Sequence, residues 1–205
     1  ADAAVQKPET FQIASSDDPA YKSGVNPVKV GRDSYEYWNG DIGQYRQNSI
    51  YWHTFYLQLP QPLKSGATYT ISVAGVDPAM RGTLALAYSE ADTSTPAVKV
   101  NQVAYSSLAK SRYAYLGWWA GDLGSVDYGA LDRFEIVDEA TGKAVLNGTL
   151  ADRIDAAGNT GERVREMDIS ALKPGRYHVR IPGLGRSSSF AVGGDALRDL
   201  YIHTQ

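Results

Sequence analysis

Apolar residues alternate with polar or small residues in short runs along much of this chain. Tyr69, Ile71 and Val73 alternate with Thr70 and Ser72, and the same pattern returns at residues 84–88, 134–136 and 177–181. A side-chain period of two is that of a β-strand with one buried face. Groups of two or three turn-forming residues separate the runs, at residues 39–41, 141–143, 147–148, 174–175 and 193–194. Many short strands joined by regular turns are typical of β-sandwiches, so we expect an all-β fold.

Length and composition narrow the class of protein further. A chain of 205 residues suits one large domain or two small ones. The hydrophobic fraction of 43% and the charged fraction of 21% are those of a globular protein. The net charge of −3 argues against a dedicated nucleic-acid binder. No apolar stretch is long enough for a membrane helix, and the absence of cysteine excludes disulfides and thiolate chemistry.

A weakly repeated sequence pattern indicates that the chain has two domains. Residues 63–69 and 172–177 both carry a turn, then a tyrosine, then a strand. In sandwiches such a tyrosine often bonds back to upstream backbone as a tyrosine corner, which we expect of Tyr69 and Tyr177. Chance recurrence of Gly-x-Tyr is the alternative. The polar residues 92–96 read as a linker, so we expect one β-sandwich at 1–96 and a second at 97–194.

The last residues, 195–205, break the β pattern. Asp195 can cap a helix, and Leu197, Leu200 and Tyr201 have the spacing of an apolar helix stripe. We expect the start of a helix here, with a frayed tail as the alternative.

The second half of the chain also carries a family resemblance. It runs Val100-Asn101-Gln102-Val103-Ala104-Tyr105, then Leu172-Lys173-Pro174-Gly175-Arg176-Tyr177, then Ser187-Ser188-Ser189-Phe190-Ala191-Val192. That order resembles the immunoglobulin-like module that precedes the catalytic domain in many bacterial glycoside hydrolase family 9 enzymes, the cellulase-type endoglucanases and cellodextrinases. Residues 1–96 look like the extra N-terminal β-domain of some members, mainly through residues 56–66.

The resemblance implies a fold and a role. The second sandwich would be immunoglobulin-like, and residues 195–205 would open the linker and first helix of an (α/α)6 catalytic barrel. The chain would be a non-catalytic region that stabilises and positions that barrel in a secreted or periplasmic bacterial β-glucanase. Its partners would be the barrel and β-glucan, with no cofactor, nucleic acid or membrane. The competing hypothesis is a free-standing carbohydrate-binding or adhesion module. The start at Ala1 fits removal of a signal peptide, and equally an arbitrary first residue.

No catalytic constellation is expected within these residues. An inverting glycosidase needs two carboxyl groups about 6.5–9.5 Å apart, and the resemblance places them in the barrel, in an Asp-Ala-Gly-Asp motif and a distant Glu. Asp155-Ala156-Ala157-Gly158-Asn159 lacks the second Asp and reads as a turn. His53, His178 and His203 are widely separated and have no local metal-binding spacing. Hydrolase activity would therefore belong to the parent protein.

One aromatic and polar segment is a candidate carbohydrate-binding surface. Its candidate residues are Tyr35, Tyr37, Trp38, Tyr45 and Trp52. Sugar rings stack on exposed aromatic faces, while neighbouring polar side chains bond the hydroxyls. Tyr51 and Trp52 must take opposite faces of a strand, so at least one of them is expected in the core. Contact with a catalytic barrel is an alternative role, because Tyr, Trp and Arg are enriched at interfaces.

A second segment is a candidate contact with another domain. Trp118 and Trp119 cannot both face one core, and Leu197, Leu200 and Tyr201 would add their stripe to the same contact. Asp122, Asp127 and Asp132 could supply oxygen ligands to Ca²⁺. Their spacing matches no EF-hand loop, so an ordinary solvated loop is favoured and no metal is expected.

Overall fold

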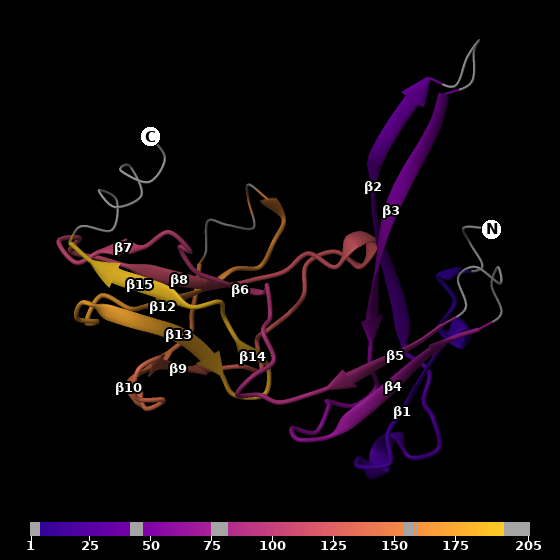
Figure 1. The fold of residues 1–205 in the computed structure, drawn as a ribbon, viewed down its shortest axis with the longest axis horizontal. Helices are drawn as coiled ribbons and strands as arrows, with labels where there is room; N and C mark the ends of the chain where they lie inside the picture. Colours follow the sequence, from indigo (N-terminus) through magenta and orange to yellow (C-terminus); the bar gives the residue numbers. More distant parts are fainter. Residues whose placement is uncertain (1–4, 42–46, 75–81, 154–157, 159, 195–205) are drawn as a thin grey trace. The chain divides into compact units, whose positions relative to one another are not determined.

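A computed structural model of the chain describes residues 5–41, 47–74, 82–153, 158 and 160–194. The chain forms two compact units (Figure 1). The first consists of Ala1–Tyr88 with Trp119–Gly124, and the second of Ser89–Trp118 with Ser125–Gln205. The predicted all-β class is confirmed. Within the described residues, no helix has the length and apolar character needed to cross a membrane.

The first unit contains a three-stranded antiparallel sheet and a separate long hairpin. The sheet has the order β1-β4-β5 and is formed by β1 (Phe11–Ala14), β4 (Thr68–Val73) and β5 (Gly82–Ala87). The hairpin pairs β2 (Lys29–Asp41) with β3 (Gln47–Gln58). Among its described residues, this unit also contains the short 3-10 helices η1 (Pro8–Thr10), η2 (Pro19–Tyr21) and η4 (Gly121–Leu123).

The core of the first unit lies between its sheet and the base of the hairpin. One cluster gathers Ile13, Tyr21, Ala67, Tyr69 and Tyr88. A second gathers Val5, Phe11 and Val30, against which Phe55, Leu57 and Val73 pack. These clusters use only the first rows of the hairpin, and Figure 1 shows the rest of β2 and β3 continuing well beyond the sheet.

The second unit is built from two sheets around one core. Its strands are β6 (Val98–Lys99), β7 (Tyr105–Ser106), β8 (Tyr113–Leu116), β9 (Arg133–Asp138), β10 (Ala144–Thr149), β11 (Ala151–Asp152), β12 (Arg165–Asp168), β13 (Gly175–Ile181), β14 (Gly185–Arg186) and β15 (Phe190–Gly193). One sheet has the order β10-β9-β13-β15-β7 with β14 on β13, and the other has the order β11-β12-β8-β6. Only the β15–β7 pair among these described strands is parallel. Leu116, Phe134, Met167, Val179 and Phe190 belong to the single core cluster.

Two of the expected turns are strands in the structure. Asn39 and Gly40 lie within β2, where they pair with Ser49 and Asn48, because the pairing continues past a register shift between Glu36 and Trp38. Asn147 and Gly148 lie within β10. A Cβ on Gly148 would come 2.4 Å from the Phe134 ring, so this glycine makes room for a core side chain instead of forming a turn.

The segment expected to be a linker is bonded to the second unit. The backbone N–H of Thr95 donates to the carbonyl of Arg186 at 2.8 Å, and the N–H of Arg186 donates to the carbonyl of Thr93 at 2.9 Å. The segment therefore extends the edge formed by β14. The expected boundary at residue 96 falls within the second unit, which begins at Ser89.

The two expected tyrosine corners differ in their partners. The Tyr177 hydroxyl donates to the Lys173 carbonyl at 3.1 Å, as a corner predicts. The buried Tyr69 hydroxyl instead donates to the Asp18 carboxylate at 2.6 Å and accepts from the Lys64 N–H at 2.7 Å. Tyr69 therefore bonds to upstream backbone as expected, by accepting from Lys64. It donates to the Asp18 carboxylate instead of a carbonyl, because η2 brings this charged and stronger acceptor to the hydroxyl.

The expected helix start at residues 195–205 lies outside the described residues, as does the expected turn at 155–159 apart from Gly158.

Candidate functional site on the β2–β3 hairpin

The β2–β3 hairpin presents two faces, because successive strand side chains point to opposite sides. The register pairs Arg32 with Phe55, Ser34 with His53, and Tyr35 with Trp52. We call the face that leads into the core the inner face; it carries Val30, Arg32, Ser34, Glu36, Tyr51, His53, Phe55 and Leu57. We call the other the open face; it carries Lys29, Gly31, Asp33, Tyr35, Trp52, Thr54, Tyr56 and Gln58.

An aromatic ladder runs along the inner face from the core toward solvent. The Phe55 ring lies 5.8 Å from the Phe11 ring, and the His53 ring lies 6.5 Å from the Phe55 ring. Tyr51 stacks on His53 with centroids 6.3 Å apart and an interplanar angle of 10°. These contacts anchor the hairpin in the first unit through one of its faces.

Ser34 and His53 lie close enough on this face to suggest a nucleophile and base. Ser34 Oγ is 2.7 Å from His53 Nδ1, and Arg32 Nε donates to Ser34 Oγ at 2.9 Å. A catalytic histidine of this kind is oriented by a carboxylate on its other nitrogen. Here His53 Nε2 lies 3.3 Å from the guanidinium of Arg32. The cluster therefore lacks the order of a catalytic triad and serves to connect the two strands.

The open face carries two exposed aromatic side chains directly opposite each other. Tyr35 is 58% exposed and Trp52 is 55% exposed. Asp33 and Thr54, also exposed, form the neighbouring pair on this face. Tyr51 on the inner face is 52% exposed. The expectation that Tyr51 or Trp52 lies in the core is wrong, because this part of the hairpin extends past the clusters that cover its base.

The base of the open face is covered by η4. A Cβ on Gly31 would come 2.6 Å from the carbonyl oxygen of Ala120 and 2.7 Å from the Leu123 side chain. Gly31 thus allows η4 to lie against β2 at this row. The covered row ends one pair before Asp33 and Thr54, so the exposed surface begins there.

The structure describes the side chains of only some of the residues that the sequence suggested for carbohydrate binding. Tyr35 and Trp52 are brought together. The backbones of Tyr37 and Trp38 lie within β2, but their side chains fall outside the described ones, and Tyr45 lies outside the described residues. Asp33 and Thr54 were missed, because their place beside the rings depends on a register that the sequence alone does not fix.

The candidate residues for a contact with another domain divide between the two units. Trp118 packs against the core of the second unit, whereas Trp119 belongs to the first unit and is 47% exposed. Leu197, Leu200 and Tyr201 lie outside the described residues.

The three aspartates considered as calcium ligands have separate partners. Asp122 accepts from the N–H of Arg32 at 2.9 Å and from Gln6 Nε2 at 2.6 Å, and these bonds lower the pKa of its carboxyl group. Asp127 pairs with Arg163 at 2.6 Å, and Asp132 lies 3.5 Å from Arg133 Nε. Across the described ranges, no three acidic or histidine side chains are grouped to hold a metal ion.

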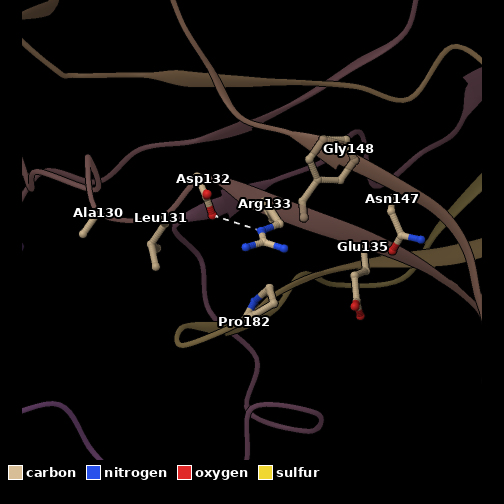
Figure 2. A pocket seen from close by; sticks show the side chains of 9 residues that line it. Ala130, Leu131, Asp132, Arg133, Glu135, Asn147, Gly148 and Pro182 are labelled. Carbon is tan, nitrogen blue, oxygen red and sulfur yellow. Dashed lines mark ion pairs between the residues drawn. The ribbon is translucent and has the colours of Figure 1, made fainter.

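A surface hollow of about 460 Å³ lies beside β9 and β10 in the second unit (Figure 2). Its wall is formed by Ala130, Leu131, Asp132, Arg133, Phe134, Glu135, Asn147, Gly148 and Pro182. The Asp132 and Glu135 carboxylates both face arginines, Arg133 in the first case and Arg180 at 2.8 Å in the second. Each of these carboxylates is therefore paired with a cation.

The second unit, with two sheets around a single core, is an immunoglobulin-like β-sandwich. The sequence of this unit identifies the type of immunoglobulin-like domain. Residues 93–186 match the family described as the cellulase N-terminal ig-like domain. The resemblance seen in the sequence is therefore confirmed for this part of the chain.

Solved structures show similarity over about half of the chain. A metagenome-derived glycoside hydrolase family 9 endoglucanase is 29% identical over 50% of this chain and 19% of its own, with a TM-score of 0.43. A Bacteroides ovatus GH9 protein is 24% identical over 51% of this chain and 17% of its own, with a TM-score of 0.38. A Zn-binding triple mutant of the family 9 endoglucanase J30 is 26% identical over 43% of this chain and 14% of its own, with a TM-score of 0.36.

The chain thus spans less than a fifth of the length of each of these three solved proteins. No curated protein matches the chain in sequence.

Proposed function

We propose that this chain is the non-catalytic N-terminal region of a secreted or periplasmic glycoside hydrolase family 9 β-glucanase. The observation that carries the proposal is the match of residues 93–186 to the cellulase N-terminal ig-like domain. Secretion is part of the proposal because a polysaccharide too large to enter the cell must be cut outside it. Catalysis would reside in a domain beyond these residues.

The role proposed for the second unit is to stabilise and position the catalytic domain. Such a role needs a rigid body, and two buried or half-buried arginines tie its loops together. Arg112 donates to the carbonyl of Leu172 at 2.9 Å and to that of Ser106 at 3.2 Å. Arg165 donates to the carbonyl of Leu150 at 2.8 Å. Domains of one chain typically bury about 600–1,500 Å² against each other, and that burial would stabilise the catalytic domain.

The test is a comparison of the parent enzyme with and without residues 1–194. We expect the shortened enzyme to unfold at a lower temperature and to lose activity sooner on heating, because its interface would lose its cover. The purified 205-residue chain, added in trans, is the control for a direct stabilising contact. An isolated catalytic domain that is equally stable and equally active would contradict the support role.

A free-standing carbohydrate-binding or adhesion module is the second candidate function. The observation that favours it is the pair of exposed rings, Tyr35 and Trp52, on the open face. Sequencing the gene beyond the codon for Gln205 separates the two functions. A long helical region with an Asp-Ala-Gly-Asp motif supports the enzyme, and a stop codon supports the free-standing module.

A further inference from the structure

We propose that the open face of the β2–β3 hairpin binds a neutral β-linked glucan chain. Tyr35 and Trp52 stack on sugar rings, and Asp33 and Thr54 bond to the sugar hydroxyls. The choice of β-glucan among neutral polysaccharides rests on the proposed function, whereas the location of the site rests on the structure of the first unit.

The first argument is the geometry of the two rings. Tyr35 and Trp52 are a direct cross-strand pair on one face of an antiparallel ribbon. Side chains paired in this way have Cβ atoms about 4.5–5.5 Å apart. Each side chain is more than half exposed, at 58% and 55%. The two exposed side chains therefore project from the same face of the two-stranded ribbon, at neighbouring positions where each can contact a sugar ring.

The second argument is the chemistry of the surrounding residues. The described side chains of the open face are Lys29, Asp33, Tyr35, Trp52, Thr54, Tyr56 and Gln58. None of these described positions is aliphatic. Aromatic rings occur at protein interfaces as well, but Asp is depleted in the buried centre of such interfaces. A sugar has apolar C–H faces and a rim of hydroxyls, which match rings flanked by the carboxylate of Asp33 and the hydroxyl of Thr54.

The third argument is that the site has a defined edge. Ala120, which directly precedes η4, and Leu123 of η4 lie against Gly31, one same-face pair before Asp33 and Thr54. A ligand on Tyr35 and Trp52 would meet this edge on one side and polar groups directly beside the rings. The bound chain would therefore cross the hairpin at the level of residues 33–35, instead of running down into the core.

The inner face supplies a matched control. Tyr51 is 52% exposed, on the residue next to Trp52, but its ring stacks on His53 and points away from the open face. Aromatic cross-strand pairs also stabilise hairpins, so a loss of binding at Tyr35 or Trp52 must be separated from a loss of structure. Removing Tyr51 weakens the same hairpin without touching the proposed platform.

The experiment uses the purified 205-residue chain. Cellohexaose is titrated by calorimetry, and migration is followed in gels with and without soluble mixed-linkage β-glucan. We expect binding by the natural chain and a loss of about tenfold or more in affinity for Tyr35→Ala and for Trp52→Ala, which corresponds to about 1.4 kcal/mol. Tyr51→Ala should bind within about twofold of the natural chain. Trp52→Phe, which keeps a ring, should recover most of the affinity.

Three outcomes would overturn the proposal: no binding by the natural chain, unchanged binding by both platform variants, or an equal loss in Tyr51→Ala. These results are independent of the parent enzyme. A chain that binds glucan but does not stabilise a catalytic domain would refute the support role alone, and the reverse result would refute the glucan site alone.

Discussion

The Tyr69 hydroxyl donates a 2.6 Å hydrogen bond to the Asp18 carboxylate inside the first unit. The same hydroxyl accepts from the Lys64 N–H, and the other Asp18 oxygen accepts from the Ala20 N–H at 3.0 Å. One tyrosine thereby joins the start of η2, the loop before β4 and β4 itself.

Replacing Tyr69 with Phe should destabilise the first unit more than Tyr177→Phe destabilises the second. Tyr177→Phe removes a bond to one carbonyl, which we expect to cost about 0.5–1.5 kcal/mol. Tyr69→Phe leaves a carboxylate and an amide without their partner, so its cost should exceed about 1 kcal/mol. Denaturant titration of each variant gives the two unfolding free energies. Equal or reversed costs would contradict the difference drawn between the two tyrosines.

The stability of the first unit should fall at acidic pH through Asp18. The hydrogen bond from Tyr69 lowers the pKa of Asp18 below its ordinary value of 3.8, with a further contribution from the Ala20 N–H. A carboxyl whose pKa is lower in the folded state stabilises above pH 3.8, and this stabilisation is lost as pH falls through the folded value. Melting temperature measured from pH 6 to pH 2 should show the fall, and Asp18→Asn should flatten it. The same slope in Asp18→Asn would assign the effect to other carboxyls.

The stability of the first unit at alkaline pH should depend on Tyr69. Burial, followed by the bond to Asp18, raises the pKa of Tyr69 from 10.0 to about 12. A group with a raised folded pKa stabilises fully below its unfolded value, and the stabilisation is lost as pH rises from about 10 through about 12. Unfolding followed between pH 8 and pH 12 should therefore show a decline that is smaller in Tyr69→Phe. If both proteins decline equally, Tyr69 does not set this limit.

Gly121→Ala should destabilise the first unit by more than Gly66→Ala. Both glycines have positive φ, +59° and +86°, so both substitutions impose backbone strain of about 1 kcal/mol. A Cβ on Gly121 would also come 2.2 Å from the carbonyl oxygen of Arg32, whereas a Cβ on Gly66 meets nothing within 4 Å. Melting temperatures of the two variants make the comparison. A Gly121→Ala protein as stable as Gly66→Ala would mean that η4 does not lie against β2 in solution.

The purified chain should release no reducing sugar from soluble β-glucans. His53 lies beside a guanidinium instead of a carboxylate, and Asp132 and Glu135 are each paired with an arginine, so we expect neither set to act as an acid and base. A reducing-sugar assay on protein purified to constant specific activity is the measurement. Turnover abolished by one Asp or Glu substitution in this chain would overturn the non-catalytic assignment.

The strands were predictable from sequence wherever one of their faces is buried. Tyr69, Ile71 and Val73 alternate with polar residues because β4 packs on the core from one side. The same pattern also predicts that Tyr51 and Trp52 take opposite faces. It does not tell whether either face is covered, since that depends on how far β2 and β3 extend beyond their sheet.

Non-local partners left no signal in the sequence. Asp18 lies far along the chain from Tyr69, and nothing around either residue marks the other as its partner. Gly148 is a second example of a position whose structure depends on a distant residue. The dipeptide Asn147-Gly148 is typical of a turn, but Gly148 lies within β10, where the absence of a side chain makes room for the Phe134 ring of the neighbouring strand β9.

The first unit takes Trp119–Gly124 from the middle of the sequence that otherwise belongs to the second. Gene rearrangement that moved residues 1–88 alone would leave behind Asp122, and with it the acceptor for the Arg32 N–H and for Gln6. Recombination after residue 88 would therefore transfer a first unit that lacks Trp119–Gly124. The two units should therefore be inherited together, as one continuous segment.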